Sequence, residues 1–499
     1  MRKQLIYSFI ILVLTISILG CQRFNPKTKK YNILFITIDD MRPQLGCYGD
    51  PVAITPNIDK IASQGLLFNR AYCQQAICGP SRTSILTGLY PNNTQVYGNH
   101  THFRENVPNT ITLPQLFKNN GYITTGLYKV FHVAGFDPEA LPQDNLNDTA
   151  SWSIPRWLPE KPVWGPYGDS IYQINKKKCL AKGKITYSNI PRSLAYNDPD
   201  VKDEMLATGE TRQKTIEYLQ QFKKSEKPFF LGVGFYKPHL PFIAPKKYWE
   251  MYNRNNIQLP ENQYAPKGVP AKFLPRSGNV RSYVNIPDSG EFSRELKKNL
   301  LHGYLACISF VDAQVGLIMQ ELEKLGLKKK TIVVVMGDHG YQIGKHNLWC
   351  KKHTNFESAT RTPLIISVPG YSESGKKVSS LVEFVDIYPT LAELCGVDAP
   401  EYLDGKSFKK LFENPQSTFR QNAFSWYGHS PGQQKAFRTE HFRFNQRAIS
   451  DSTFYELYDH RKDPEENVNV AYKPEYDNVV ASMKQIVNKK MKKIKKNSK

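Results

Sequence analysis

Three apolar stretches of the sequence are each followed at once by acidic or histidine side chains. The stretches are YNILFITI, KTIVVVMG and PFFLGVGFYKP, and the residues that follow them are Asp39, Asp40, Asp338, His339 and His239. Continuous β-branched and aromatic runs of this kind predict buried strands of a parallel sheet. Open parallel sheets hold their sites at the carboxyl ends of the strands, so we expect these side chains to meet at one edge. The three carboxylates are hard oxygen ligands, which favour Ca²⁺ or Mg²⁺ over zinc.

A cysteine close to an arginine marks the segment CGPSRTSILTG, residues 78–88. Cys78 on its own is open to several roles: a thiolate nucleophile, half of a disulfide or a buried structural thiol. Other cations recur near the predicted strand ends, namely Lys129, His132, Lys351 and Lys352. A metal, arginine, lysine and histidine grouped around one residue suit a ligand with several charged oxygens, such as sulfate or phosphate.

Alternating strands and helices must position these residues. Besides the three strands above, the patterns predict a helix at 55–65, a helix–turn–strand unit at 112–129, a helix at 299–324 and a strand within 362–370. Strands that alternate with helices predict a parallel α/β sheet.

The character of the chain changes after about residue 415. Short alternating strands and turn residues come first, and a basic helical stretch follows at 474–496. We therefore predict a catalytic domain at 31–415 and a smaller α+β subdomain with a basic tail at 416–499.

The composition fits one large domain with a smaller one, because 40% of the 499 residues are hydrophobic. The formal net charge of +22 is compatible with nucleic acid, an anionic membrane surface or an anionic polysaccharide. Zinc-finger spacing, RNA-binding signatures and basic regions with heptads are missing from the sequence, which argues against nucleic acid. We interpret the basic tail at 489–499 as a solvated end.

The first residues predict export. Two basic residues precede an apolar run at 5–19, and Gly20 and Cys21 follow in ILGC, which is typical of a bacterial lipoprotein signal. We expect a leader at 1–21, a polar linker at 22–30, and a location in the bacterial periplasm or at the cell surface with a lipid on Cys21. The alternative is an uncleaved membrane anchor. Seven other cysteines remain, an odd number, so at least one is left for a role outside disulfides.

The segment at 78–88 fits the sulfatase signature Cys-x-Pro-Ser-Arg-x-x-x-x-Thr-Gly along its whole length. Further blocks, in order from about residue 31 to 470, are TIDDMRPQLGCYGD, KVFH, VGFYKPHLPF, GDHGYQIGKHNLWCKKHTNF and ELYDHRKDPEENVN. Together they resemble the iduronate-2-sulfatase branch of the type I sulfatases. The resemblance implies an alkaline-phosphatase-like α/β fold, with a large, mixed, mostly parallel sheet flanked by helices and a smaller α+β C-terminal subdomain.

The resemblance also implies a role for Cys78. In this family the cysteine is oxidised to Cα-formylglycine by a formylglycine-generating or anaerobic sulfatase-maturating enzyme, and Pro80 and Arg82 match the motif that marks it. The aldehyde hydrates to a gem-diol, and one hydroxyl attacks sulfur while an acid protonates the departing sugar oxygen. The second hydroxyl is then deprotonated, which expels sulfate and regenerates the aldehyde. Because a disulfide would block this conversion, we expect Cys73 and Cys78 not to pair.

The other roles are carried over by matching positions. Asp39, Asp40, Asp338 and His339 match the ligands of one Ca²⁺ per chain, and the residue made from Cys78 completes the set. Arg82 and Lys129 match the pair that holds the formylglycine hydroxyls and the sulfate. His132 matches the base, and His239 with Lys352 matches the sulfate contact and leaving-group acid. The family usually has one lysine where this chain has Lys351 and Lys352, so Lys351 is the alternative.

The preferred substrate is an anionic sulfated polysaccharide or its oligosaccharides, with the 2-O-sulfate of a uronic acid favoured by the branch. Glycosaminoglycans and algal polymers such as ulvan contain such sugars, and His100, His102 and Arg104 are either sugar contacts or ordinary loop residues. A phosphodiesterase or phosphonate hydrolase of the same superfamily is the alternative enzyme. A non-catalytic glycan-binding protein is disfavoured, because the cysteine and all the metal-type carboxylates are present.

Overall fold

The computed structural model describes residues 30–133, 146–183, 185, 189–275, 280–371, 373–428, 434–449 and 452–497. The chain divides into two compact units, Met1–Lys30 and Tyr31–Lys499, and the second contains every element below. The expected leader at 1–21 and its linker up to residue 29 lie outside the described residues, so they stay predictions.

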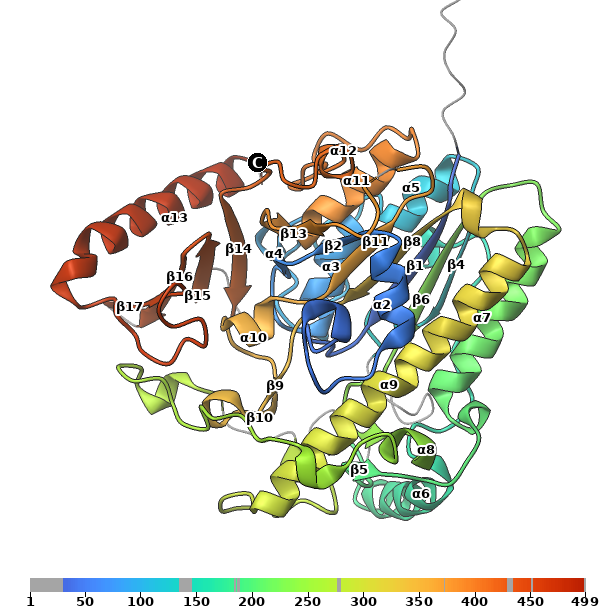
Figure 1. The fold of residues 1–499 in the computed structure, drawn as a ribbon, viewed down its shortest axis with the longest axis horizontal. Helices are drawn as coiled ribbons and strands as arrows, with labels where there is room; N and C mark the ends of the chain where they lie inside the picture. The colour runs from blue at the N-terminus through green and yellow to red at the C-terminus, as the bar shows by residue number, and fades with distance from the viewer. Residues whose placement is uncertain are drawn as a thin grey trace, which may run out of the picture. The chain divides into compact units, whose positions relative to one another are not determined.

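A seven-stranded sheet forms the centre of the large unit (Figure 1). Its strands, in spatial order, are β12 (Lys377–Val378), β2 (Leu66–Phe68), β11 (Leu364–Ser367), β8 (Thr331–Gly337), β1 (Asn32–Ile38), β6 (Phe229–Phe235) and β4 (Ile123–Tyr128). Neighbours pair in parallel except at β11, which runs antiparallel to β8 and β2. The sheet is therefore mixed and mostly parallel, and the predicted fold class is confirmed.

The central strand β1 is buried on both faces, as its continuous apolar pattern predicts. Leu34, Ile36 and Ile38 belong to the core under α2 (Pro56–Ser63), α7 (Ala207–Lys223) and α9 (Arg294–Lys324). The alternate residues Ile33 and Phe35 belong to the opposite core. That core packs under α3 (Cys78–Thr87), α5 (Leu113–Asn119) and α11 (Ile387–Leu394). The two-residue period of a strand thus supplies both layers of helices.

Helix α9 begins at Arg294, five residues before the start expected from its periodicity, because Ser293 caps it by accepting a hydrogen bond from the Leu296 amide. Its most apolar window is long and hydrophobic enough to cross a membrane, but 83% of that window is buried inside the protein. This burial marks α9 as a core helix, and Figure 1 shows it beside α7.

A separate four-stranded antiparallel sheet lies toward the C-terminus. It consists of β14 (Asn422–Tyr427), β15 (Gln434–Thr439), β16 (Phe442–Ile449) and β17 (Ser452–Asp459), and α13 (Asp477–Asn497) packs on it. Val480, Met483 and Val487 bury the apolar side of α13. The expected α+β subdomain is present, while its exact boundary at 415/416 stays a prediction.

The remaining described α-helices and strands are short, except α6 with its 17 residues. They are β3 (Ala71–Tyr72), α4 (Pro91–Thr94), α6 (Gly165–Ala181), β5 (Tyr196–Asn197), β7 (Phe242–Ile243), α8 (Lys246–Trp249), β9 (Gln342–Ile343), β10 (Trp349–Lys351), α10 (Glu357–Thr360), β13 (Val382–Glu383) and α12 (Lys410–Glu413). Of these, β10 and α10 contribute to the sites described below.

Candidate active site

Cys78 is the first residue of α3, and it is fully buried at the carboxyl edge of the sheet. Its Sγ lies 3.1 Å from Lys352 Nζ, 3.3 Å from His339 Nε2 and 3.4 Å from Asp39 Oδ1. The helix N-terminus also directs its positive dipole end toward this position. Burial and the Asp39 carboxylate raise the pKa of the thiol, but Lys352, Lys129 and His339 together lower it to about 6.

Asp39 and Asp40 leave β1, and Asp338 and His339 leave the adjacent strand β8. The amides of Asp40 and His339 both donate to Asp338 Oδ1, at 3.2 and 3.0 Å. Asp40 adopts a positive φ of 61°. Such backbone strain in a non-glycine residue is typical of functional sites, where the surrounding structure enforces it.

Four side chains offer ligand atoms that lie within 4.8 Å of one another: Asp39, Cys78, Asp338 and His339. Beside them, Asp40 Oδ2 is buried without a hydrogen-bond partner, and it lies 3.7 Å from His239 Nε2. Burial raises the pKa of Asp40 to about 7, and the neighbouring Asp39 adds to the rise. An orphaned carboxylate oxygen among crowded negative groups fits a divalent cation of the hard, oxygen-preferring class.

Arg82 lies one turn along α3 and is 1% exposed. Its Nε forms an ion pair with Asp338 Oδ2 at 2.9 Å, and its NH1 donates to the Thr37 hydroxyl and the Lys129 carbonyl. Its NH2 is buried and has no hydrogen-bond partner. One guanidinium therefore links three strands of the sheet and keeps an unused donor in the site.

Lys129 follows β4 and forms a buried ion pair with Asp39. Its Nζ also lies 4.3 Å from the centre of the Tyr236 ring, which is a cation–π contact. His132 is buried nearby, and its Nδ1 has no hydrogen-bond partner. Burial and the charge of Lys129 hold the pKa of His132 well below its ordinary value, so its ring is neutral at neutral pH.

His239 follows β6 and has a side chain that is 24% exposed, so it is reached from solvent. Its Nδ1 lies 2.6 Å from the Leu240 carbonyl, which assigns the proton to Nδ1 and leaves Nε2 facing Asp40. Burial and Lys352 lower the pKa of His239 well below its ordinary value.

The two adjacent lysines are used differently. Lys352 Nζ lies 2.8 Å from Asp40 Oδ1. Burial lowers the pKa of Lys352, but the negative charges around it, that of Asp40 first, outweigh burial and raise it. Lys351 forms no ion pair among the described residues, and burial lowers its pKa. Cys350 has a φ of 56°, and the register of β10 shifts between Trp349 and Lys351. This bulge interrupts the alternation of the strand.

The structure thus brings together the ten residues that the sequence assigned to the site, while the alternative Lys351 forms no ion pair among the described residues, and the individual roles stay predictions. Sequence reasoning missed Thr37, Tyr236 and Asn99, whose Oδ1 accepts from the Gly79 amide at 2.8 Å. None of the three carries a spacing signal of its own.

Two of the three loop residues considered as sugar contacts form contacts within the fold. Arg104 forms a bidentate pair with Asp148, at 2.5 and 2.9 Å. His102 Nδ1 caps a short helical turn by accepting from the Arg104 amide. These contacts favour the interpretation as ordinary loop residues.

Cys73 and Cys78 are both free thiols, as expected. Cys73 Sγ points to the Ala359 carbonyl at 3.9 Å, whereas Cys78 Sγ lies among the charged groups described above. Burial raises the pKa of the Cys73 thiol, so only Cys78 has the surroundings of a reactive position.

A second cluster of metal-type side chains, Glu357, His460 and Glu466, is explained without a metal. Arg443 forms ion pairs with both glutamates, and Arg438 Nε lies 3.2 Å from Glu357 Oε2. The arginines already supply the positive charge that a cation would bring. We therefore assign this cluster to the contact between α10 and the C-terminal sheet.

Comparisons with known proteins agree with this geometry. The family model described as Sulfatase matches residues 31–397, and one described as N-sulphoglucosamine sulphohydrolase, C-terminal, matches residues 344–493. Iduronate 2-sulfatase of Mus musculus is 32% identical over 431 residues, which cover 80% of this chain and 74% of that protein.

Two solved structures show the same fold. BT4656, in complex with its substrate D-glucosamine-2-N,6-O-disulfate, superposes with a TM-score of 0.73 at 23% identity, covering 94% of this chain and 99% of the other. Phosphonate monoester hydrolase of Agrobacterium radiobacter gives a TM-score of 0.73 at 22% identity, covering 94% and 96%. The sulfatase model spans most of the chain, and the relative with the higher identity is a sulfatase. The chain therefore belongs to the sulfatase family as an iduronate-2-sulfatase-like type I sulfatase, and it is a sulfuric ester hydrolase.

Proposed function

We propose that this enzyme removes the 2-O-sulfate of a uronic acid in a sulfated polysaccharide or its oligosaccharides, using a formylglycine made from Cys78. The observation that carries the proposal is the position of Cys78 Sγ, 3.1 to 3.4 Å from Lys352, His339 and Asp39. The name of the mouse relative, iduronate 2-sulfatase, supports the sugar and the position.

The surroundings of Cys78 fit an aldehyde that becomes a hydrated nucleophile. Formylglycine would supply a diol, one hydroxyl of which attacks sulfur while the other later allows sulfate to leave. Lys129, Lys352 and Arg82 are cations beside this position, and the unused NH2 of Arg82 is a donor for a sulfate oxygen. Cations held in a buried site stabilise a sulfuryl group more strongly than they would in water.

The carboxylates support a calcium site. Asp39, Asp40, Asp338 and His339 would hold one Ca²⁺, together with an oxygen of the residue made from Cys78. The ion would supply charge that polarises the sulfate. His339 is a nitrogen donor, which is less usual for calcium, so the identity of the ion belongs to the proposal.

Two histidines are proposed to move protons. His132 is neutral and has a free Nδ1, so it can take a proton from a hydroxyl at residue 78. His239, whose side chain is 24% exposed, is proposed to protonate the leaving sugar oxygen, with Lys352 as its partner in this role. In the free enzyme His239 is neutral, so the negative charge of a bound sulfate ester must raise its pKa before it can act as an acid.

We also propose export as a lipoprotein anchored through Cys21, on the strength of the sequence ILGC after an apolar run. A separate maturating enzyme is the implied partner that converts Cys78. A labelled-palmitate incorporation experiment with and without Cys21→Ser tests the anchor, and equal labelling of both proteins would refute it.

A substrate panel tests the proposed reaction. The matured enzyme is incubated with uronic acid 2-O-sulfate, hexosamine 6-O-sulfate and a phosphate diester, and released sulfate or phosphate is measured. We expect the uronic acid 2-O-sulfate to give the highest kcat/KM and Cys78→Ala to abolish turnover. A clear preference for the phosphate diester would instead support the alternative phosphodiesterase or phosphonate hydrolase.

A further inference from the structure

A large polar cavity lies apart from the residues around Cys78. Its volume is about 940 Å³, and most of its lining side chains are charged or polar. One wall comes from the catalytic domain and includes Arg42, Arg70, Arg361 and Lys377. The other wall comes from the C-terminal sheet and its following loop and includes Arg438 and His441.

This cavity opens at the same edge of the large sheet as the active site. Leu67 of β2 pairs with Ile365 of β11, so the next residue, Phe68, lies beside Leu364. Leu364 pairs with Met336 of β8, and Met336 pairs with Thr37 of β1. Arg70 comes two residues after Phe68 of β2, and Asp338 comes two residues after Met336 of β8. Arg70 and Asp338 therefore leave the sheet at the same edge. Because β2 and β8 are separated only by β11, their axes lie roughly 10 Å apart.

Three of the five carboxylates that line the cavity form ion pairs with residues other than these four cations. Glu357 and Glu466 accept ion pairs from Arg443, and Lys345 pairs with Glu465. Within the described residues none of the lining carboxylates forms an ion pair with the four cations, although the charge of Arg361 helps to lower the pKa of Glu357.

The catalytic-domain wall instead carries four cations that form no ion pair among the described residues. In each arginine side chain only Nε donates a hydrogen bond among the described residues, and each acceptor is neutral: Gln44 Oε1 at 2.9 Å from Arg42, the Ser379 carbonyl at 2.5 Å from Arg70, and the Asn69 carbonyl at 2.7 Å from Arg361. The terminal guanidinium nitrogens of these three arginines make no hydrogen bond within the described part of the chain. A guanidinium held by Nε presents its other nitrogens as a fork that matches carboxylate and sulfate oxygens.

We propose that this cavity, lined by Arg42, Arg70, Arg361 and Lys377, is an accessory site that binds sulfate and carboxylate groups of the saccharide chain outside the reacting sugar. The proposal rests on the proposed function for its ligand class and adds a second point of contact for a polymer. A volume of about 940 Å³ is of the size that encloses small molecules, so a few linked sugars fit it better than a flat membrane surface.

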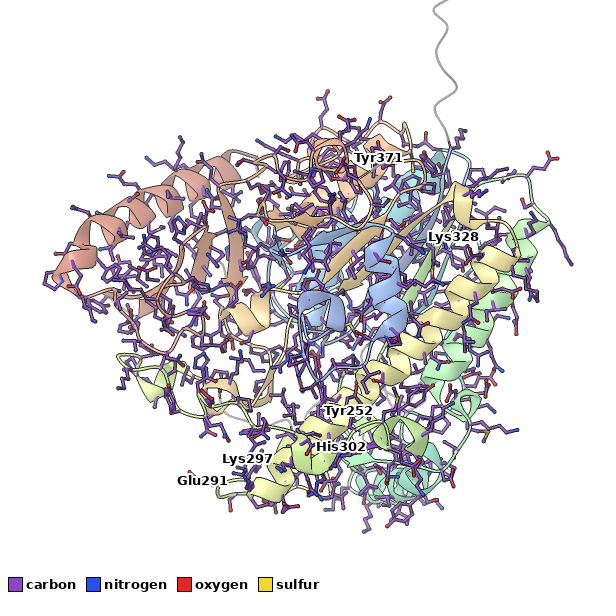
Figure 2. All side chains as sticks on the ribbon, viewed as in Figure 1. Tyr252, Glu291, Lys297, His302, Lys328 and Tyr371 are labelled. Carbon is purple, nitrogen blue, oxygen red and sulfur yellow. The ribbon has the colours of Figure 1, made fainter. Side chains whose placement is uncertain are left out.

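Binding to an inactive protein tests this site without relying on turnover. The Cys78→Ala protein is titrated with a heparin-derived hexasaccharide, with a single 2-O-sulfated uronic acid and with single-stranded DNA of matched charge. The same titrations are made with Arg70→Gln and Lys377→Gln combined. The control is Lys329→Gln combined with Lys330→Gln, which removes the same charge at the amino edge of β8, beside Lys328 in Figure 2.

We expect the cavity variant to bind the hexasaccharide at least about tenfold more weakly, which corresponds to about 1.4 kcal/mol, and with a smaller dependence on salt. The control variant should bind like the parent, and the monosaccharide should not distinguish the variants. In the active background the cavity variant should keep kcat on the monosaccharide and raise KM for the hexasaccharide.

Unchanged hexasaccharide binding in a cavity variant that melts like the parent would overturn the proposal, as would an equal loss in the control. Stronger dependence of DNA binding on the cavity would also overturn it, in favour of a nucleic-acid site. Failure of the proposed function would look different, because sulfate release would be missing while hexasaccharide binding still depended on Arg70 and Lys377.

Discussion

The two adjacent lysines after β10 offer a sharp test of the site, because they are alike in sequence and opposite in surroundings. Lys352 Nζ lies 2.8 Å from Asp40 Oδ1 and 3.1 Å from Cys78 Sγ. Lys351 has no such contacts within the described residues. We therefore compare Lys352→Ala with Lys351→Ala, a matched pair that removes the same charge one residue away.

The expected magnitudes follow from these contacts. Removing one partner of a buried ion pair costs about 3–5 kcal/mol. Asp40 keeps His339 Nδ1 at 3.4 Å as a second partner, so we expect the lower end, about 3 kcal/mol, for Lys352→Ala. Loss of one donor to a developing negative charge lowers kcat by about 10²–10³-fold. Lys351→Ala removes a charge that burial disfavours, so its rate should stay within about threefold of the parent.

The assay is sulfate release from a small sulfate ester, with kcat divided by the fraction of Cys78 converted in each preparation. Mass spectrometry of the peptide that contains residue 78 gives that fraction, so a maturation defect cannot be mistaken for a catalytic one. Thermal unfolding of both variants measures the stability difference. A larger loss of kcat in Lys351→Ala than in Lys352→Ala would refute the assignment.

Three further predictions address the frame around the site. A Cβ on Gly234 would lie 2.0 Å from the Lys129 backbone carbon, so Gly234→Ala should cost about 1–3 kcal/mol and lower kcat. Gly232→Ala, whose Cβ would meet side chains only, the nearest a valine at 3.0 Å, should have a smaller effect, and equal melting temperatures of the two variants would contradict this. Dialysis against a chelator should lower the rate and the melting temperature, and added Ca²⁺ should restore both, whereas an enzyme indifferent to chelation would speak against the metal. Burial raises the pKa of Glu357, but Arg438 and Arg443 hold it below its ordinary value. The carboxylate therefore stabilises the fold above pH about 4.5, and this contribution is lost as the pH falls. The difference in the free energy of unfolding between the parent and Glu357→Gln should narrow in acid, and a difference that widens would refute the direction of the shift.

Most of the strands that position the site could be predicted from the sequence, because the patterns that indicate them are local. The buried runs that end at Asp39, His239 and Asp338 predicted β1, β6 and β8, and the rule for open parallel sheets predicted that their ends would meet. The helix at 55–65 was predicted from its amphipathic pattern, and α2 occupies Pro56–Ser63. The family resemblance supplied the rest of the site residues.

Features that depend on tertiary contacts could not be predicted. The family resemblance favoured Lys352 over Lys351, but the bulge at Cys350, between the strand residues Trp349 and Lys351, is not revealed by any periodicity. The unpaired guanidinium forks of Arg70 and Arg361 depend on carbonyl acceptors far away along the chain. A single sequence shows that these residues are charged, but not that their charges converge on one cavity.

The most direct test of the central claim is the dependence of sulfate release on the state of residue 78. The protein is produced with and without a maturating enzyme, the fraction converted from thiol to aldehyde is measured by mass spectrometry, and the rate of sulfate release is measured on the same samples. We predict that the rate rises in proportion to the converted fraction and extrapolates to zero for the unconverted thiol. Full activity in protein whose Cys78 is entirely unconverted would contradict the account.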